Sequence, residues 1–111
     1  MKMTLSRGDV VVCVLAGDYG KPRPAVIVQS DLFNSTHSSV VVCPITSYLI
    51  DAPLFRKALN PTDINGLSSK SQIMTDKLTA IKTEKIAEKI GKLTEKEIND
   101  LNNAIKLWLG V

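Results

Sequence analysis

The chain has 111 residues, with 14 basic and 11 acidic side chains and a formal net charge of +3. Since domains usually span roughly 100–200 residues, this length predicts a single domain over residues 1–111 and excludes a multi-domain enzyme. Hydrophobic residues make up 44% and charged residues 23%, as in globular proteins, which excludes intrinsic disorder. The mild positive charge permits a polyanionic partner without requiring one.

Two cysteines, Cys13 and Cys43, lie inside the apolar runs VVVCVL and VVVCPI, a pattern typical of buried thiols in strands. The chain has no CxxC pair, and His37, its only histidine, is far from both cysteines in sequence. We therefore expect no metal site and no cofactor. No apolar segment resembles a signal peptide or a membrane span. These features predict a reduced, cytoplasmic protein that does not contact a membrane.

The first two-thirds of the chain reads as short strands joined by loops. Apolar, β-branched or alternating runs predict the strands, while Gly, Pro, Asn and Asp mark the loops between them. The expected strands are 9–15, 25–30, 39–46, 53–59 and one or two within 71–81. Because Pro44 lacks an N–H, we expect a strand edge or bulge there. Residues 31–38 predict a helical turn or a polar loop.

The hydrophobic period then changes from two to about 3.6 residues, which indicates helix. Thr83 is placed to cap a short helix that Gly91 ends. Thr94 and Glu97 have the spacing of a capping box at the start of a terminal helix, whose apolar stripe predicts a core-facing Trp108. The fold class expected is mainly β with a C-terminal helix, in which the strands curl into a small closed or half-closed barrel.

Arg23 is the most informative polar residue, because Pro22 and Pro24 fix the backbone on both sides of it. A rigidly held guanidinium suits a phosphate, to which it donates two parallel hydrogen bonds. Lys21 adds a second cation. The alternative is an ordinary surface arginine where a loop enters a strand.

Three other positions carry side chains suited to chemistry. Thr46 and Ser47 place hydroxyls at the end of an apolar strand, where they either bind a phosphate oxygen or close the strand end. Asp76, beside Lys77, either pairs with an arginine or takes part in proton transfer. His37 is a candidate general base, although its polar loop favours plain exposure.

Taken together, these segments resemble the MazF/PemK family of bacterial type II toxins, the messenger-RNA interferases. The resemblance covers nearly the whole chain in the right order. The matching stretches are RGDVV (7–11), GKPRPAVIV (20–28), VVVCPITS (40–47), Gly66-Leu67, SQIMTDKLTAI (71–81) and KIAEKIGKLT (85–94). The RPAVIV and PITS parts are the most specific.

The resemblance implies an SH3-like barrel with a terminal helix, a homodimer, and single-stranded RNA bound along the dimer interface. It also implies metal-independent cleavage, in which the ribose 2′-OH attacks the adjacent phosphorus and leaves a 2′,3′-cyclic phosphate and a 5′-OH. A small antitoxin with an acidic, disordered tail is the implied protein partner.

The resemblance also assigns roles to residues. Arg23 matches the arginine that contacts the scissile phosphate, Thr46 matches the phosphate-binding hydroxyl, and Asp76 aligns with an acidic residue near the cleavage site. The implied RNA-binding positions are Tyr19, Lys21, Ser47 and Lys77. One departure is that Met74 and Thr79 stand where several members carry a further arginine.

Two other functions fit the same barrel. A non-catalytic gyrase poison would place its functional residues on the terminal helix, and the presence of Arg23 together with Thr46 argues against it. A non-catalytic RNA-binding module of the SH3 type would need more exposed aromatic residues than an aromatic content of 5% supplies.

Overall fold

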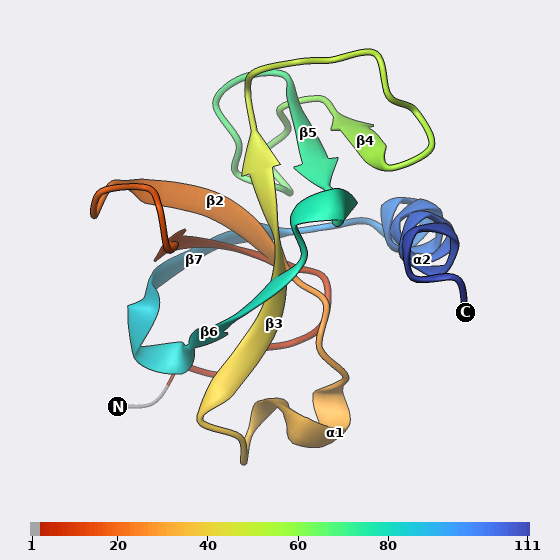
Figure 1. Ribbon diagram of the computed structural model, residues 1–111. Helices are drawn as coiled ribbons and strands as arrows, with labels where there is room; N and C mark the ends of the chain where they lie inside the picture. The colour runs from red at the N-terminus through yellow and green to blue at the C-terminus, as the bar shows by residue number, and fades with distance from the viewer. Residues whose placement is uncertain (1–2) are drawn as a thin grey trace.

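The computed structural model describes residues 3–111 as one strongly bent antiparallel sheet with a long helix along one side (Figure 1). The sheet order is β4-β5-β3-β2-β1-β7, and β6 pairs separately with β3. In chain order the elements are β1 (Asp9–Val14), β2 (Pro22–Ile27), α1 (Asp31–Asn34), β3 (Ser39–Thr46), β4 (Arg56–Leu59), β5 (Ser71–Met74), the 3-10 turn η1 (Thr75–Lys77), β6 (Thr79–Lys82), the 3-10 turn η2 (Thr83–Lys85), β7 (Ile86–Lys92) and α2 (Glu95–Leu109).

The predicted class, mainly β with a C-terminal helix, is confirmed. The barrel is a loose one, because β4 and β7 end the strand order without pairing with each other. The apolar core forms two clusters, and α2 contributes Leu101 to one of them. The other cluster gathers Val11, Ala25 and Val42, against which Ile81 and Ile86 also pack. The sheet therefore curls around this second cluster, which gives it a barrel-like shape.

Strand β3 is the centre of the fold. One of its edges pairs with β2, while the other pairs first with β6 through Ser39–Val42 and then with β5 through Ile45 and Thr46. Cys43 and Pro44 fall between these two partners. Pro44 thus lies inside β3 and pairs with Ala25 on one side, and its missing N–H coincides with a break in pairing on the other.

The helix predicted between Thr83 and Gly91 is wrong. Only η2 is helical there, and the rest is strand β7, which pairs with β1 so that Gly91 lies opposite Val10. A side chain at Gly91 would collide with the backbone of Ile64 and Asn65. Pairing with the otherwise open edge of β1 overrides the local helical pattern, since an unpaired edge leaves backbone hydrogen bonds unmade.

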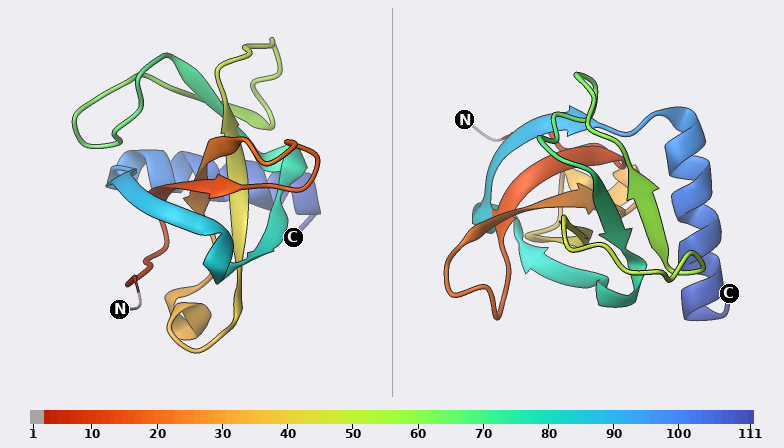
Figure 2. Two further views of the ribbon diagram at one scale, coloured as in Figure 1. Left: turned by 90° about the vertical axis from the view of Figure 1, so that its left-hand side faces the viewer. Right: turned by 90° about the horizontal axis from the view of Figure 1, so that it is seen from above.

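Helix α2 begins as the sequence predicts, with the Thr94 hydroxyl and the Glu97 carboxylate forming a capping box. The expectation of a core-facing Trp108 is wrong, because its side chain is 49% exposed. Its ring lies against that of Phe55, the residue just before β4, with 5.3 Å between the ring centroids. Figure 2 shows that α2 runs beside β4 at one side of the sheet, and the helix packs against β4 and η1.

Both cysteines are buried, as predicted, Cys13 in β1 and Cys43 in β3. Burial raises the pKa of Cys13 to about 11 and that of Cys43 to about 12. Because the thiolate is the reactive form, we expect neither thiol to react with a maleimide in the native protein at neutral pH, and both to react after unfolding in denaturant. Mass spectrometry of the labelled chain measures this, and rapid labelling of the native protein would contradict it.

Candidate functional site

A groove of about 530 Å³ opens between the β1–β2 loop, the end of β3 and the loop that precedes β5. Its charged and hydroxyl-bearing lining residues are Asp18, Lys21, Arg23, Thr46, Ser47, Tyr48, Ser68, Ser69 and Ser71. The structure thus brings together four of the predicted site residues: Lys21, Arg23, Thr46 and Ser47. Two cations and several hydroxyls around one open groove form a set of donors suited to a phosphate-containing ligand.

Arg23 lies on the part of β2 that extends beyond β3, since β3 pairs with β2 only from Ala25 onwards. Pro22 and Pro24 are tolerated there because this part of the strand has β1 as its only neighbour in the sheet. The same geometry leaves Arg23 open to the groove, with 34% of its side chain exposed.

Asp18 holds the Arg23 guanidinium through two hydrogen bonds. Nε donates to Oδ2 at 2.8 Å, and Nη2 donates to Oδ1 at 3.3 Å. The β1–β2 loop places Asp18 by local hydrogen bonds, in which the Asp18 N–H donates to Leu15 O and the Lys21 N–H donates to Asp18 O. The Arg23 guanidinium carries more N–H donors than its two bonds to Asp18 use, so Arg23 can bind a phosphate without releasing Asp18.

Thr46 ends β3 at the opposite wall of the groove. Its Oγ1 accepts a hydrogen bond of 3.1 Å from the Tyr48 N–H, which turns the chain at Ser47. The hydroxyl therefore partly closes the strand end, as one sequence-based alternative expected. Its own proton remains available to a ligand oxygen, because the bond to Tyr48 uses it only as an acceptor.

The third wall, residues 60–71, is held by a buried amide. The Asn65 Oδ1 accepts from the N–H groups of Thr62 and Leu67, and its Nδ2 donates to Asn60 O. Gly66 follows with a positive φ of 70° and lies so close to Ile90 of β7 that no side chain fits. This wall is therefore built against β7, the strand that the sequence predicted as helix.

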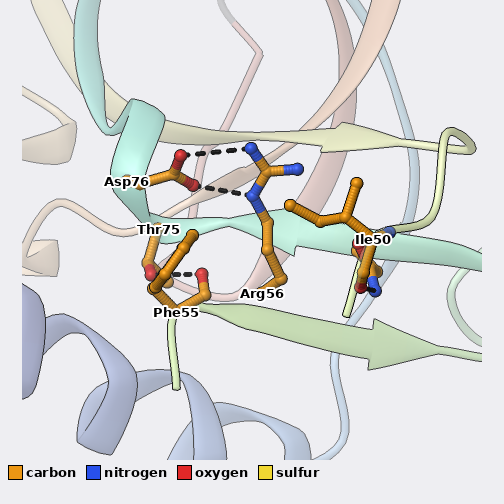
Figure 3. Close-up of polar contacts among 6 residues, drawn as sticks. Ile50, Phe55, Arg56, Thr75 and Asp76 are labelled. Atoms are coloured by element: carbon orange, nitrogen blue, oxygen red, sulfur yellow. Dashed lines mark hydrogen bonds and ion pairs between the residues drawn. The ribbon is translucent and has the colours of Figure 1, made fainter. Parts of the chain in front are cut away.

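Asp76 lies outside the groove, in an ion pair with Arg56 (Figure 3). The Arg56 Nε and Nη2 donate to the two carboxylate oxygens at 2.8 and 3.1 Å, and only 11% and 14% of the two side chains are exposed. These hydrogen bonds, more than the opposing effect of burial, lower the pKa of Asp76. The pair joins η1 to β4. The structure therefore supports pairing with an arginine, and proton transfer by Asp76 stays a prediction.

The remaining predicted residues also lie outside this groove. Tyr19 forms the tip of the β1–β2 loop and is 98% exposed, and Lys77 is exposed at the end of η1. His37 follows α1, which lies at the other end of β3 from Thr46, and is exposed as expected (Figure 1).

In residues 3–111 no three His, Cys, Asp or Glu side chains gather in a way that would hold a metal ion. None of the helices described is long and apolar enough to cross a membrane.

Residues 6–109 match the family described as "PemK-like, MazF-like toxin of type II toxin-antitoxin system". The chain belongs to this toxin family. It is 38% identical over 108 residues to "Probable endoribonuclease MazF" of Mycolicibacterium smegmatis, covering 96% of this chain and 98% of the relative. It is 30% identical over 117 residues to endoribonuclease MazF of Staphylococcus saprophyticus, covering 96% and 92%.

Solved structures show the same fold in other toxins of this kind. The Mycobacterium tuberculosis toxin MazF-mt6 superimposes with a TM-score of 0.81 at 21% identity, covering 93% of this chain and 97% of that one. A MazE-MazF crystal structure from Deinococcus radiodurans gives a TM-score of 0.80 at 20% identity, covering 99% of each chain. The family and the fold expected from the sequence are therefore confirmed.

Sequence reasoning missed two charged residues of this toxin. Asp18 stands five positions before Arg23, and the β1–β2 turn folds the two together; an acidic residue so placed in a glycine-containing turn was the available signal. Arg56 reaches Asp76 from 20 positions away, across the β4–β5 pairing. No local sequence pattern predicts the contact between Arg56 and Asp76. Arg56 also supplies an arginine next to Asp76, in the region where Met74 and Thr79 depart from the family pattern.

Replacing Asp76 with asparagine tests what the Arg56 pair does. Because the pKa of Asp76 is lowered in the folded chain, the carboxylate stabilises the fold at neutral pH, and this contribution is lost as the pH falls through the acidic range. We expect Asp76→Asn to lower the free energy of unfolding by about 2 kcal/mol at neutral pH, with the difference from the wild type shrinking in acid. Denaturant unfolding at several pH values measures both effects.

Asp100→Asn is the matched control, since Asp100 forms an exposed pair with Lys96 on α2 and its loss should change stability little. An Asp76→Asn variant as stable as this control at neutral pH would show that the buried pair does not stabilise the fold. Its RNA-cleavage activity, compared at equal folded fraction, also tests the predicted catalytic role of Asp76.

Proposed function

We propose that this toxin is an endoribonuclease that cuts single-stranded RNA in the groove between the β1–β2 loop and the end of β3. The observation that carries the proposal is that Arg23, Asp18 and Thr46 converge on one open groove. The names of the two relatives, both MazF endoribonucleases, support the activity. The family match favours this function over the gyrase poison, and the Asp18 carboxylate beside the Arg23 guanidinium in the groove favours it over a passive RNA-binding module.

The reaction proposed is attack of a ribose 2′-OH on the adjacent phosphorus. The Asp18 carboxylate takes the proton of the 2′-OH, the O2′–P bond forms, and the P–O5′ bond breaks. The leaving O5′ takes a proton from water, to which the groove is open. The products are a 2′,3′-cyclic phosphate and a 5′-OH end. Because the nucleophile belongs to the substrate, the route requires no metal-activated water, and DNA, which lacks the 2′-OH, is not cut.

Each groove residue has a different role in the proposed reaction. The Arg23 donors that Asp18 leaves free stabilise the negative charge that builds on the phosphorus oxygens. The Thr46 hydroxyl donates to one of these oxygens, and Ser47 lies beside it. Lys21 attracts the phosphate backbone as a point charge. Tyr19 and Lys77, which lie outside the groove of one chain, are proposed to contact RNA further along its path.

Two partners follow from the same proposal. Complexes such as MazE-MazF and an endoribonuclease with its cognate antitoxin are among the similar structures. We infer that this toxin acts as a homodimer in the cytoplasm and is neutralised by a cognate antitoxin. An acidic antitoxin segment would find Lys21 and Arg23 accessible at the groove.

Incubation of the purified protein with a long RNA and with matched single-stranded DNA, both in EDTA, tests the function. We expect discrete RNA cuts with 5′-OH ends, mapped by primer extension, and intact DNA. Intact RNA would contradict the ribonuclease and direct attention to gyrase, through a supercoiling assay. Cutting that disappears in EDTA and returns with a divalent ion would contradict the proposed chemistry.

A further inference from the structure

Tyr48 is an exposed aromatic side chain in the wall of the groove. It follows Thr46 by two positions, and 77% of it is exposed, although it lines the groove. The two residues after it, Leu49 and Ile50, are also 46% and 37% exposed. The other strongly exposed aromatic residues, such as Tyr19 and Phe33, do not line this groove. Tyr48 is therefore not part of the hydrophobic core, and packing does not explain an aromatic side chain at this position.

The segment that carries Tyr48, residues 47–50, is fastened at both ends. At its start the Tyr48 N–H donates to Thr46 Oγ1. At its end the side-chain amide of Gln72 bonds both backbone groups of Ile50: Nε2 donates to Ile50 O at 2.8 Å, and Oε1 accepts from the Ile50 N–H at 3.1 Å. Figure 3 shows Ile50 close to β5, the strand of Gln72.

Both fastenings start from the same rung of the sheet, because Thr46 of β3 lies directly opposite Gln72 of β5. The rung that presents the Thr46 hydroxyl to the groove thus also fixes the segment that follows it. A side-chain amide that reproduces the two hydrogen bonds of a β-bridge keeps an exposed turn in one conformation. Little conformational entropy is then lost when a ligand binds to Tyr48.

We propose that Tyr48 stacks on one base of the bound RNA, next to the phosphate held by Arg23 and Thr46, and that Gln72 is the residue that positions Tyr48. The inference rests on the proposed ribonuclease function and adds to it the residue that binds a base. An exposed tyrosine ring suits this role, since every base offers a flat face and stacking tolerates sequence variation.

The test begins with cleavage mapping of the wild-type protein, which yields an RNA oligonucleotide that contains one cleavage site. Its fluorescein-labelled form with a 2′-O-methyl group at that site cannot be cut, so fluorescence anisotropy reports its Kd. We expect Tyr48→Ala to raise the Kd about tenfold, whereas Tyr48→Phe, which keeps the ring, stays near the wild type. Phe33→Ala, an exposed aromatic replaced outside the groove, is the matched control and should change nothing.

Oligonucleotides with one abasic nucleotide, moved stepwise through the sequence, identify the stacked base. The wild type should lose about tenfold in affinity at one position, and Tyr48→Ala should lose nothing more there. Failure of the wild type to cut any RNA would overturn the proposed function and this inference with it. Cutting by the wild type together with an unchanged Kd for Tyr48→Ala would overturn the inference alone.

Variants of Gln72 test whether this residue positions Tyr48 for RNA binding or only stabilises the fold. Gln72→Leu keeps the size of the side chain and loses both bonds to Ile50, so we expect a Kd raised several-fold with an unchanged unfolding temperature. Gln72→Glu keeps the oxygen that accepts from the Ile50 N–H, so its Kd should lie between those of the wild type and Gln72→Leu. Adding Gln72→Leu to Tyr48→Ala should weaken binding no further, because both changes remove the same contact. Additive losses in the double variant would show that Gln72 does not act through Tyr48.

Discussion

We expect replacement of Arg23 with alanine to reduce RNA cleavage about 1000-fold, because in the proposed mechanism this groove residue is the main donor to the charge that develops on phosphorus. The loss should appear mainly in kcat, since the donors matter most when the extra charge builds up. The fold should be unaffected: the Arg23 side chain is 34% exposed, and its ion pair with Asp18 lies at the surface of a loop. Quantified cleavage of a single-site RNA oligonucleotide measures the effect.

Two further variants make this result specific. Arg23→Lys keeps the charge but loses the planar fork, so its rate should recover only in part. Lys85→Ala removes an exposed cation of η2, away from the groove, and should cleave normally. If Arg23→Ala, shown to be folded by circular dichroism, cuts RNA at nearly the wild-type rate, Arg23 does not bind the scissile phosphate.

Replacing Asp18 with asparagine will lower kcat about 100- to 1000-fold with little change in KM, because an amide cannot take the proton of the 2′-OH. The side chain keeps its size and an oxygen that can still accept from Arg23, so the position of the guanidinium should change little. This combination separates proton transfer from the positioning of Arg23. Single-turnover rates with the same oligonucleotide provide the measurement.

Glu84→Gln supplies the control for this change, since Glu84 is an exposed acid of η2 that does not line the groove. We expect it to cleave as the wild type does. An Asp18→Asn variant with a raised KM and an unchanged kcat would mean that Asp18 only holds Arg23 in place. The general base would then have to be another group.

Much of the strand layout could be predicted from the sequence. The run SVVVCPIT predicted β3 with its observed bounds, and DVVVCVL predicted β1 to within one residue of its end. Such runs are informative because a strand buried on both faces needs consecutive β-branched residues. Residues 71–81 do split into two strands, with the turn η1 between them.

The candidate site was only partly predictable. Arg23 and Thr46 stand in local patterns, a proline-flanked arginine and a hydroxyl at a strand end, and the structure places both on the groove. Asp18 had only the weak signal of an acidic residue in a glycine-containing turn, and Gln72 had none. Each acts through a partner that the β-sheet brings close: Asp18 across the β1–β2 turn, and Gln72 through its place opposite Thr46.

The sequence by itself determined the family, the mainly β class with a terminal helix and the buried cysteines, and it predicted Arg23 and Thr46 as phosphate-binding residues. These features can be predicted from local sequence patterns, because burial and turn formation depend on residues that are close together in the chain. Only the tertiary structure decided that residues 86–92 form a strand, that Trp108 lies half exposed, and that Asp76 pairs with Arg56 away from the groove. Each of these depends on a partner distant in the chain, whose hydrogen bonds or packing outweigh the local preference.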